Sequence, residues 1–392
     1  MTTERVRARI TGATSHGSLL ELIRATGGMS RQQLLASTGM SRATLYERLE
    51  ALLRRHFIYE AESMEATGGR RSRKIRFDDR GRVVLAFAMG QTHATVAVSD
   101  TNGLVLRART VQHFINAPAE EVLQPLIRIG GELLDAGNEE QLIGIGVGVP
   151  APVEAETGYV VHPTTIPGWE PGAVVTAMSA RWPVPVVVEN DARAGALGEC
   201  RDDSDTTVYV KIATGIGCGI VVEGAILQGA HGAAGDIGHI HIASDGALCR
   251  CGRRGCLATF SSGGSLLDRL GNEGINTLDD IVAAAGAGNA SVEAALLTAA
   301  DVLGGALAAT VTTVNPNKLV LGGKIGTIPL FANQVRDRVL RDVVERIAYG
   351  LTVTAGQPGD TAAVDGLTRL VIGKVYSAKA IDALLNDLVP SS

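Results

Sequence analysis

Short apolar segments that end in glycine-rich turns recur along the chain from Val83 onwards. They include VVLAFAMG, LIGIGVGVP, VYVKIATGIG and NKLVLGG, each of the length of one buried strand. The chain has 48 glycines and only 4% aromatic residues, a composition that suits closely packed backbones and tight turns. Because these segments alternate with helical patterns, such as that from about Glu120 to Ala136, the sequence predicts an α/β protein.

The strand segments fall into two sets, which predict two α/β lobes. The first set opens with VVLAFAMG, TVAVSD and LVLRARTV, whose short connections predict an antiparallel meander at a sheet edge. We place the first lobe at residues 83–205 and the second at 206–392, with the C-terminal helix a candidate to return to the first lobe. Glycine turns at the strand ends can present backbone N–H groups to an anion or a sugar in a cleft between the lobes, although each alone is compatible with a plain tight turn.

Residues 1–82 differ from the rest of the chain in charge. They carry 16 Lys and Arg against 9 Asp and Glu, whereas the remainder carries 20 against 32, which together give the net charge of −5. A basic front end on an acidic body indicates an anionic partner for the front end.

The segment SRQQLLASTGMSRATLYERLEALLRRH predicts two helices joined by a tight turn at Gly39. The strands FIYEAES and RKIRF follow on either side of MEATGGRRS, so the pattern is typical of a winged helix-turn-helix domain over residues 1–82. The alternative is a small helical packing module whose arginines are merely solvated. The candidate DNA-contacting residues are Ser41, Arg42, Thr44, Tyr46 and Arg48 on the second helix and Arg70, Arg71 and Arg73 on the wing.

A dense Cys/His group follows in the segment GHIHIASDGALCRCGRRGC. His239, Cys249, Cys251 and Cys256 have the spacing His-x9-Cys-x-Cys-x4-Cys. One imidazole and three thiolates suit tetrahedral Zn²⁺, and four protein ligands leave no position for a catalytic water, so the pattern predicts a structural zinc site. The alternative is three reduced thiols beside a core histidine.

The body resembles the ROK family of repressors and sugar kinases. The resemblance covers essentially the whole chain and rests on GIGVGVPAPVEAETG, IPGW, VVVENDARAGALGE, TGIGCGIVVEG, GAAGDIGH, CRCGRRGC and NPNKLVLGG. It implies the two-lobed actin-like ATPase (ribonuclease H-like) fold. A winged helix-turn-helix ahead of such a body implies one of the family's transcriptional regulators, because the kinases lack that domain.

The same resemblance implies a sugar site at Asn190, Asp191, Asp236 and His239, with Asp191 in the place of the kinases' general base. It also implies that the zinc-binding histidine touches the bound sugar. The kinases' Asp-x-Gly-Gly-Thr-Lys-like phosphate loop corresponds here to AMGQTH, in which Ala88 replaces the Asp and Gln91 replaces a glycine. Since phosphoryl transfer depends on metal and phosphate positioning, we expect no kinase activity and at most a vestigial role for Asp191 as a base.

The sequence therefore predicts a DNA-binding regulator, most simply a repressor, with operator DNA, a sugar effector and a structural Zn²⁺ as partners. A homodimer or homotetramer is expected, since a symmetric assembly places two winged domains on operator half-sites. A cytoplasmic location is expected, because MTTERVRARI has charge but no apolar stretch behind it. No membrane association is expected, because the apolar segment from Ala294 to Val314 contains Asp301 and is typical of a buried helix. Three alternatives remain open: a sugar kinase with an appended DNA-binding domain, a ligand-independent repressor, and a repressor controlled by another protein.

Overall fold

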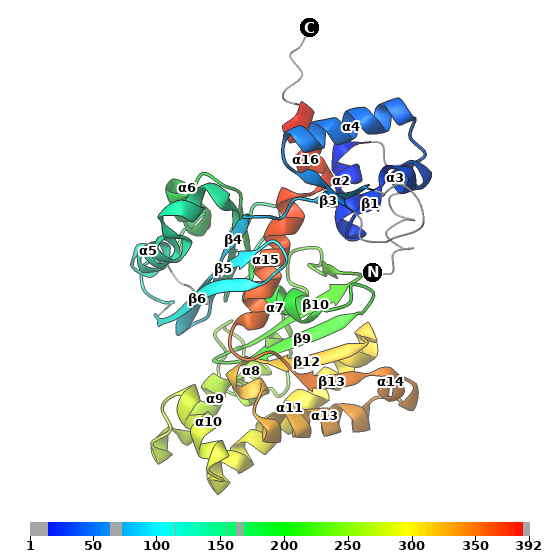
Figure 1. Ribbon diagram of the computed structural model, residues 1–392. Helices are drawn as coiled ribbons and strands as arrows, with labels where there is room; N and C mark the ends of the chain where they lie inside the picture. Colours follow the sequence, from blue (N-terminus) through cyan, green and yellow to red (C-terminus); the bar gives the residue numbers. More distant parts are fainter. Residues whose placement is uncertain are drawn as a thin grey trace.

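The computed structural model describes residues 15–62, 73–113, 115–154, 156–161, 166 and 168–386. Within these residues the chain forms a small N-terminal domain with a three-stranded sheet and a body with two five-stranded sheets (Figure 1). The predicted winged helix-turn-helix and two-lobed α/β body are both confirmed.

The N-terminal domain is built on three helices whose ends are set by local sequence. They are α2 (His16–Ala25), α3 (Arg31–Thr38) and α4 (Arg42–Arg54). A capping box starts α3, because the Ser30 hydroxyl accepts from the Gln33 N–H while the Gln33 side chain accepts from the Ser30 N–H. Gly39 ends α3 in the left-handed region at φ 67°, and Ser41 caps α4, so the tight turn between the helices is as predicted.

The wing strands pair beside these helices. The strands β1 (Met29–Ser30), β2 (Ile58–Glu62) and β3 (Arg73–Phe77) form an antiparallel sheet in the order β1-β3-β2. The predicted strands on either side of the wing therefore form a hairpin. Its tip, with Arg70 and Arg71, lies outside the described residues.

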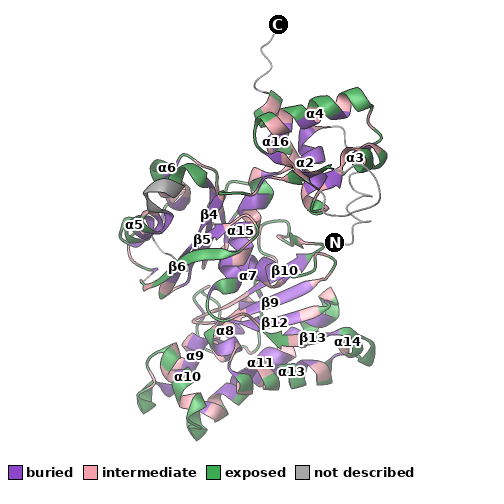
Figure 2. Ribbon diagram, in the orientation of Figure 1, coloured by how far each residue is buried: buried purple, intermediate pink, exposed green. Residues whose placement is uncertain are grey.

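The first lobe contains the predicted antiparallel meander and two parallel strands. Its strands are β4 (Val83–Met89), β5 (His93–Asp100), β6 (Val105–Gln112), β7 (Leu142–Val149) and β8 (Val186–Asn190), in the order β6-β5-β4-β7-β8. β4 and β7 are buried along nearly their whole length (Figure 2). The helices α5 (Ala119–Asn138) and α6 (Ala173–Arg181) pack with these strands to form the core of the lobe.

The second lobe repeats the plan with a larger helical layer. Its strands are β9 (Thr207–Ile212), β10 (Ile216–Val222), β11 (Ala225–Ile226), β12 (Lys318–Gly322) and β13 (Thr352–Ala355), in the order β11-β10-β9-β12-β13. Its helices are α8 (Ala258–Ser261), α9 (Gly263–Leu270), α10 (Leu278–Gly286), α11 (Ala290–Val314), α12 (Gly323–Gly326), α13 (Pro329–Asp342) and α14 (Glu345–Gly350). Among the described residues, α11 is long and apolar enough to cross a membrane, but its buried face packs against α13 in the lobe core.

Two helices connect the parts of the molecule. α7 (Asp191–Glu199) follows β8, and α15 (Thr361–Val375) follows β13 but packs against α7 and the first-lobe strands β4, β7 and β8. The last described helix, α16 (Ala378–Asn386), packs against α2 of the winged domain rather than against a lobe (Figure 1). The C-terminal segment thus touches the first lobe through α15 and the winged domain through α16.

The crossing of α7 and α15 depends on two glycines. A Cβ on Gly366 would lie 1.8 Å from the Ala194 carbonyl oxygen, and one on Gly198 would lie 1.9 Å from the Ala362 carbonyl oxygen. The two helix backbones are therefore in direct contact, which no larger residue at these positions permits.

Gly366→Ala should lower the free energy of unfolding by about 1 to 3 kcal/mol, because the added methyl forces α15 away from α7. Gly373→Ala is the matched control on the same helix, since a Cβ there meets no atom within 4 Å. It should raise the free energy of unfolding by about 0.5 to 1 kcal/mol through helix propensity alone. Urea unfolding of both variants measures the difference, and equal effects would contradict the tight crossing.

Candidate functional site

The four predicted metal ligands come together in the loop region after β11. His239 ends a short 3₁₀ helix, Ile237–His239, and the three cysteines follow in a compact loop. Isolated bridges pair His241 with Cys256 and Leu248 with Arg254 and so fold this loop back on itself. One donor atom from each of the four predicted ligands lies within 4.8 Å of the others.

The donor spacing is that of a tetrahedral metal site. The Sγ atoms of Cys251 and Cys256 are 3.6 Å apart, and Cys249 Sγ lies 3.5 Å from His239 Nδ1. Ligands at about 2.0 to 2.3 Å from a tetrahedral ion are separated by roughly 3.5 to 3.8 Å. Burial opposes ionisation of Cys251, but hydrogen bonds with Arg253 and with the neighbouring Cys256 and Cys249 together outweigh it and lower the pKa of this thiol to about 6. The cluster can therefore hold a metal ion with a closed protein shell.

The two sugar-site candidates at the start of α7 have different surroundings. The Asn190 side-chain oxygen accepts from the N–H groups of Ala192 and Arg193, so it caps the helix. Asp191 is 8% exposed, and its Oδ2 accepts from the Lys211 ammonium at 2.9 Å. Asn190 thus fixes the turn that presents Asp191, whose carboxylate is already paired with a cation.

A buried ion pair holds the surrounding loops. Arg193, in the first turn of α7, is 2% exposed and donates to Glu189, near the end of β8, at 2.7 Å. It also donates to the carbonyls of Val153, in the first lobe, and Gly232, in the second. Burial raises the pKa of Glu189, and the Arg193 charge opposes that rise. The pair therefore fixes one loop from each lobe at the start of α7.

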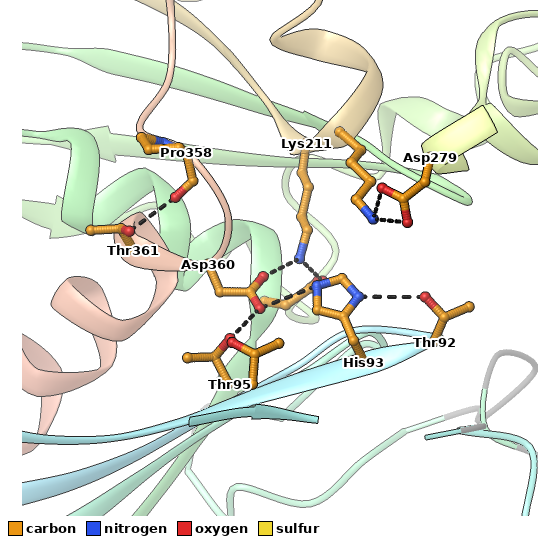
Figure 3. Close-up of polar contacts among 11 residues, drawn as sticks. Thr92, His93, Thr95, Lys211, Asp279, Pro358, Asp360 and Thr361 are labelled. Atoms are coloured by element: carbon orange, nitrogen blue, oxygen red, sulfur yellow. Dashed lines mark hydrogen bonds and ion pairs between the residues drawn. The ribbon is translucent and has the colours of Figure 1, made fainter. Parts of the chain in front are cut away.

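A second charged cluster lies beside Asp191 and includes residues that sequence reasoning missed. Lys211 of β9 donates to Asp191 and lies 3.8 Å from Asp360 Oδ1, just before α15 (Figure 3). The other Asp360 oxygen accepts from Thr95 at 2.9 Å and lies 3.2 Å from His93 Nε2. Burial alone would lower the pKa of Lys211, but Asp191 and Asp360 together raise it. The one sequence signal was a lysine inside the apolar strand VYVKI.

The segment AMGQTH, which the family resemblance aligned with a phosphate loop, makes contacts within the protein. Ala88 is buried in β4, and the Gly90 N–H donates to the His93 carbonyl in the β4–β5 turn. Gln91 accepts from Arg250, which lies between Cys249 and Cys251. The β4–β5 turn therefore contacts the Cys/His loop directly.

Asp236 and His239 lie at the start of the metal-binding region, against the second sheet. Asp236 is exposed and precedes the 3₁₀ helix that ends at His239. A Cβ on Gly235 would lie 2.3 Å from the Cys218 carbonyl oxygen of β10, so this segment is pressed onto the strand.

Some of the candidate DNA-contacting side chains are exposed, whereas others are bonded to neighbouring side chains of the winged domain. Tyr46 is 52% exposed and Arg42 is exposed, whereas the Ser41 and Thr44 hydroxyls bond to each other at 2.8 Å at the start of α4. Arg48 points back to His16 of α2, with 2.8 Å between Nη1 and Nδ1. Arg73 is paired with Glu60 across the wing strands at 3.2 Å.

Comparison with known proteins links this architecture to one family. The family model described as "ROK family" matches residues 84–374. The xylose repressor of Bacillus subtilis is 26% identical over 362 residues, which cover 90% of this chain and 94% of that protein.

Two solved structures extend the comparison. A ROK family transcriptional regulator, described as a homologue of the Escherichia coli MLC protein, has 25% identity and a TM-score of 0.78, covering 95% of this chain and 98% of that one. A ROK family glucokinase from Streptomyces griseus, solved with glucose and AMPPNP, has 25% identity and a TM-score of 0.62, but covers 74% of this chain and 98% of its own.

Arg193→Met should lower the free energy of unfolding by about 3 to 5 kcal/mol near neutral pH, because it leaves the buried Glu189 carboxylate without its cation. Loss of Arg193 should also raise the pKa of Glu189 further above its ordinary value of 4.5. Between the ordinary pKa of Glu189 and its raised pKa in the folded variant, the folded state holds a proton that the unfolded state releases. The free energy of unfolding of the variant therefore falls as pH rises through this range. Its difference from the wild type shrinks as pH falls towards about 5. Urea unfolding across this range measures both effects.

Arg336→Met provides the control, since Arg336 and its partner Asp337 are both exposed. Its effect should be about 1 kcal/mol or less at every pH. An Arg193→Met protein as stable as the wild type near neutral pH would contradict the role assigned to the Glu189 pair.

Proposed function

Because the chain belongs to the ROK family, we propose that it is a DNA-binding transcriptional repressor whose body binds a sugar that alters operator affinity. One observation carries the proposal. The similarity to a repressor and to a regulator structure spans at least nine-tenths of the chain, whereas the glucokinase structure spans 74%. The difference matches the winged domain, which is the part that a DNA-binding regulator needs and a kinase does not.

The proposed DNA surface lies on α4 and the wing. Arg42 and Tyr46, which are exposed, are placed to reach base edges or phosphates in a major groove, together with Ser41, Thr44 and Arg48. Arg73, with Arg70 and Arg71 beyond the described residues, would contact the neighbouring backbone or minor groove. A homodimer or homotetramer would place two such domains on operator half-sites.

The proposed sugar site is the region around the start of α7. Asp191 and Asp236 would accept hydrogen bonds from sugar hydroxyls, with Asn190 and His239 beside them. The xylose repressor and the glucose-bound kinase among the relatives make a neutral pentose or hexose the first class to test. Cytoplasmic location follows from this role as an expectation.

Catalysis by the same site is disfavoured by the chain's own residues. Ala88 offers no carboxylate where the kinases' phosphate loop has one, and Gln91 is bonded to Arg250. Asp191, in the general-base position, is paired with Lys211, and a carboxylate that already holds a cation is a poor acceptor for a hydroxyl proton. We therefore propose a binding protein rather than a sugar kinase.

The metal cluster is proposed to hold a structural Zn²⁺ through His239, Cys249, Cys251 and Cys256. Three thiolates and one imidazole are the donor set that zinc prefers, and the ion would stabilise a loop with little regular structure. Through His239 the same ion would also orient one wall of the sugar site.

The purified protein should contain about one zinc per chain, and Cys251→Ser should lose most of it and melt at a lower temperature. Cys218→Ala is the control, because Cys218 is buried outside the cluster. Metal analysis by mass spectrometry and thermal melts give the two readouts. The proposal would be contradicted if Cys251→Ser kept the full zinc content, or if the wild-type protein contained no zinc.

Operator binding provides the central test. A DNA duplex enriched from random sequence by the wild-type protein should bind at least about 5-fold more weakly when the effector sugar is present, the lower end of ordinary allosteric coupling. D-xylose and D-glucose are the first probes, each with and without Mg-ATP. Arg42→Ala should weaken binding by about 1 to 3 kcal/mol, and Arg346→Ala, an exposed change in the second lobe, should not.

The outcomes separate the alternatives. Sugar phosphate formed from Mg-ATP would indicate a kinase with an appended DNA-binding domain. Operator binding unaffected by a broad sugar panel would indicate a ligand-independent or protein-controlled repressor. Failure to enrich any duplex would overturn the DNA-binding role itself.

A further inference from the structure

The Lys211 cluster joins both lobes and the starts of both connecting helices. Lys211 belongs to the second lobe, whereas His93 and Thr95 belong to β5 of the first lobe. Asp191 begins α7, and Asp360 directly precedes α15. In Figure 3 the Lys211 ammonium and the His93 ring approach the Asp360 carboxylate from different elements. A change in any one of these contacts therefore changes the groups that hold the Asp360 carboxylate at the start of α15.

α15 connects this cluster to the DNA-binding domain. At 1.5 Å per residue, its 15 residues span about 22 Å. The backbone contacts at Gly198 and Gly366 join α15 to α7. We therefore expect the two helices to move together. In Figure 1, α15 runs from between the lobes towards the winged domain.

The far end of α15 is inserted into the winged domain through Tyr376. The ring is 1% exposed and packs edge-on against Phe77, with 4.8 Å between ring centroids, and against Phe57 at 6.3 Å. Its hydroxyl accepts from Arg82 at 2.8 Å, and the Arg24 guanidinium lies 5.0 Å above its ring. Displacement of the end of α15 must therefore move groups of the winged domain.

Beyond Tyr376, α16 packs on α2 of the winged domain, and α2 in turn contacts Arg48, one of the candidate DNA-contacting residues. The Ala378 N–H donates to Glu21, and the Gly17 N–H donates to Asp382, both at 2.9 Å. A Cβ on Gly17 would lie 2.2 Å from the Ala378 carbonyl oxygen, so α2 and α16 touch through their backbones. The neighbouring residue, His16, holds the Arg48 side chain.

We propose that Lys211 and Asp360 are the coupling residues of the proposed sugar response, and that α15 carries the state of the Asp191 site to α2 and α4. The proposal rests on the proposed function, because it takes Asp191 as a sugar contact. A sugar hydroxyl that bonds Asp191 competes with Lys211 for the carboxylate. The ammonium is then free to move towards Asp360, now 3.8 Å away, and the starts of α7 and α15 change together.

Lys211 and Asp360 act through other groups, since neither contacts the DNA surface. Loss of Lys211 should free Asp191 as a bound sugar does, even with no sugar present. Loss of the Asp360 carboxylate should release the start of α15 from Thr95 and His93 of the first lobe, and so should disturb the same helix. This permits a test that does not depend on knowing the effector. The duplex enriched by the wild-type protein is the probe, and the full-length protein is used throughout.

Lys211→Met and Asp360→Asn should each weaken binding of that duplex at least about 5-fold and speed amide exchange in α16 and α2. Lys211→Arg, which keeps the cation, should restore most of the affinity. Lys324→Met is the matched control, because Lys324 is a half-exposed second-lobe lysine paired with Asp279. It should leave both measurements unchanged.

A double-mutant cycle between the two ends of α15 covers the case in which Lys211→Met does not fold. Tyr376→Phe keeps the ring and removes only the bond from Arg82. If α15 is the relay, the fold-changes of Asp360→Asn and Tyr376→Phe on duplex affinity should not multiply, whereas independent sites this far apart should give multiplicative effects.

The outcomes are distinct. Wild-type affinity in Lys211→Met and Asp360→Asn, or multiplicative effects in the cycle, would overturn the relay while leaving the repressor proposal intact. A wild-type protein that enriches no duplex would overturn the proposed function instead. Weakened binding with rescue by Lys211→Arg and a non-multiplicative cycle supports the relay.

Discussion

The direct backbone contact between α7 and α15 is the constraint on which the rest of the molecule depends. Two helices can approach this closely only where glycine removes the side chain, as at Gly198 and Gly366. The crossing brings Asp191 and Asp360, 169 positions apart in the printed sequence, to one lysine. It also brings α16 to the winged domain. The Lys211 cluster and the winged domain are thus connected by one structural element.

The charges at this crossing are arranged in two buried pairs with different tasks. Glu189 lies near the end of β8 and Arg193 in the first turn of α7, and the remaining donors of Arg193 bond to backbone carbonyls of both lobes. All of its partners are fixed, so this pair is suited to hold shape. Lys211 shares one ammonium between two carboxylates, at 2.9 and 3.8 Å. A cation that lies near two acceptors has a second partner within reach, which suits the proposed relay.

The parts of the fold that the sequence predicted are those set by local chemistry. The helix turn at Gly39 and the group from His239 to Cys256 each lie within one short segment of the chain, so a pattern can be recognised directly. The meander was predictable because consecutive strands usually pair.

The contacts that sequence reasoning missed join distant segments. Nothing near Lys211 indicates that Asp360 faces it, and nothing near Arg193 indicates that its partners include the Gly232 carbonyl. The same holds for α16, which follows the second lobe in the chain but packs on the first described helix. A charged residue in an apolar strand or helix start signals a buried partner but does not identify it.

The position of Lys211 suits the proposed role of this body as a sugar sensor. Buried carboxylates that lie close together need a neighbouring cation. A bound metal ion could supply that charge, but the charge of the cluster would then depend on a second ligand. Lys211 supplies the charge from within the chain, so Asp191 and Asp360 have a cation without any ligand. In the proposal, a neutral sugar that takes an oxygen of Asp191 would change the pairing but not the total charge. The response would then need only a shift of one side chain, which the contact between α7 and α15 would pass to both helices.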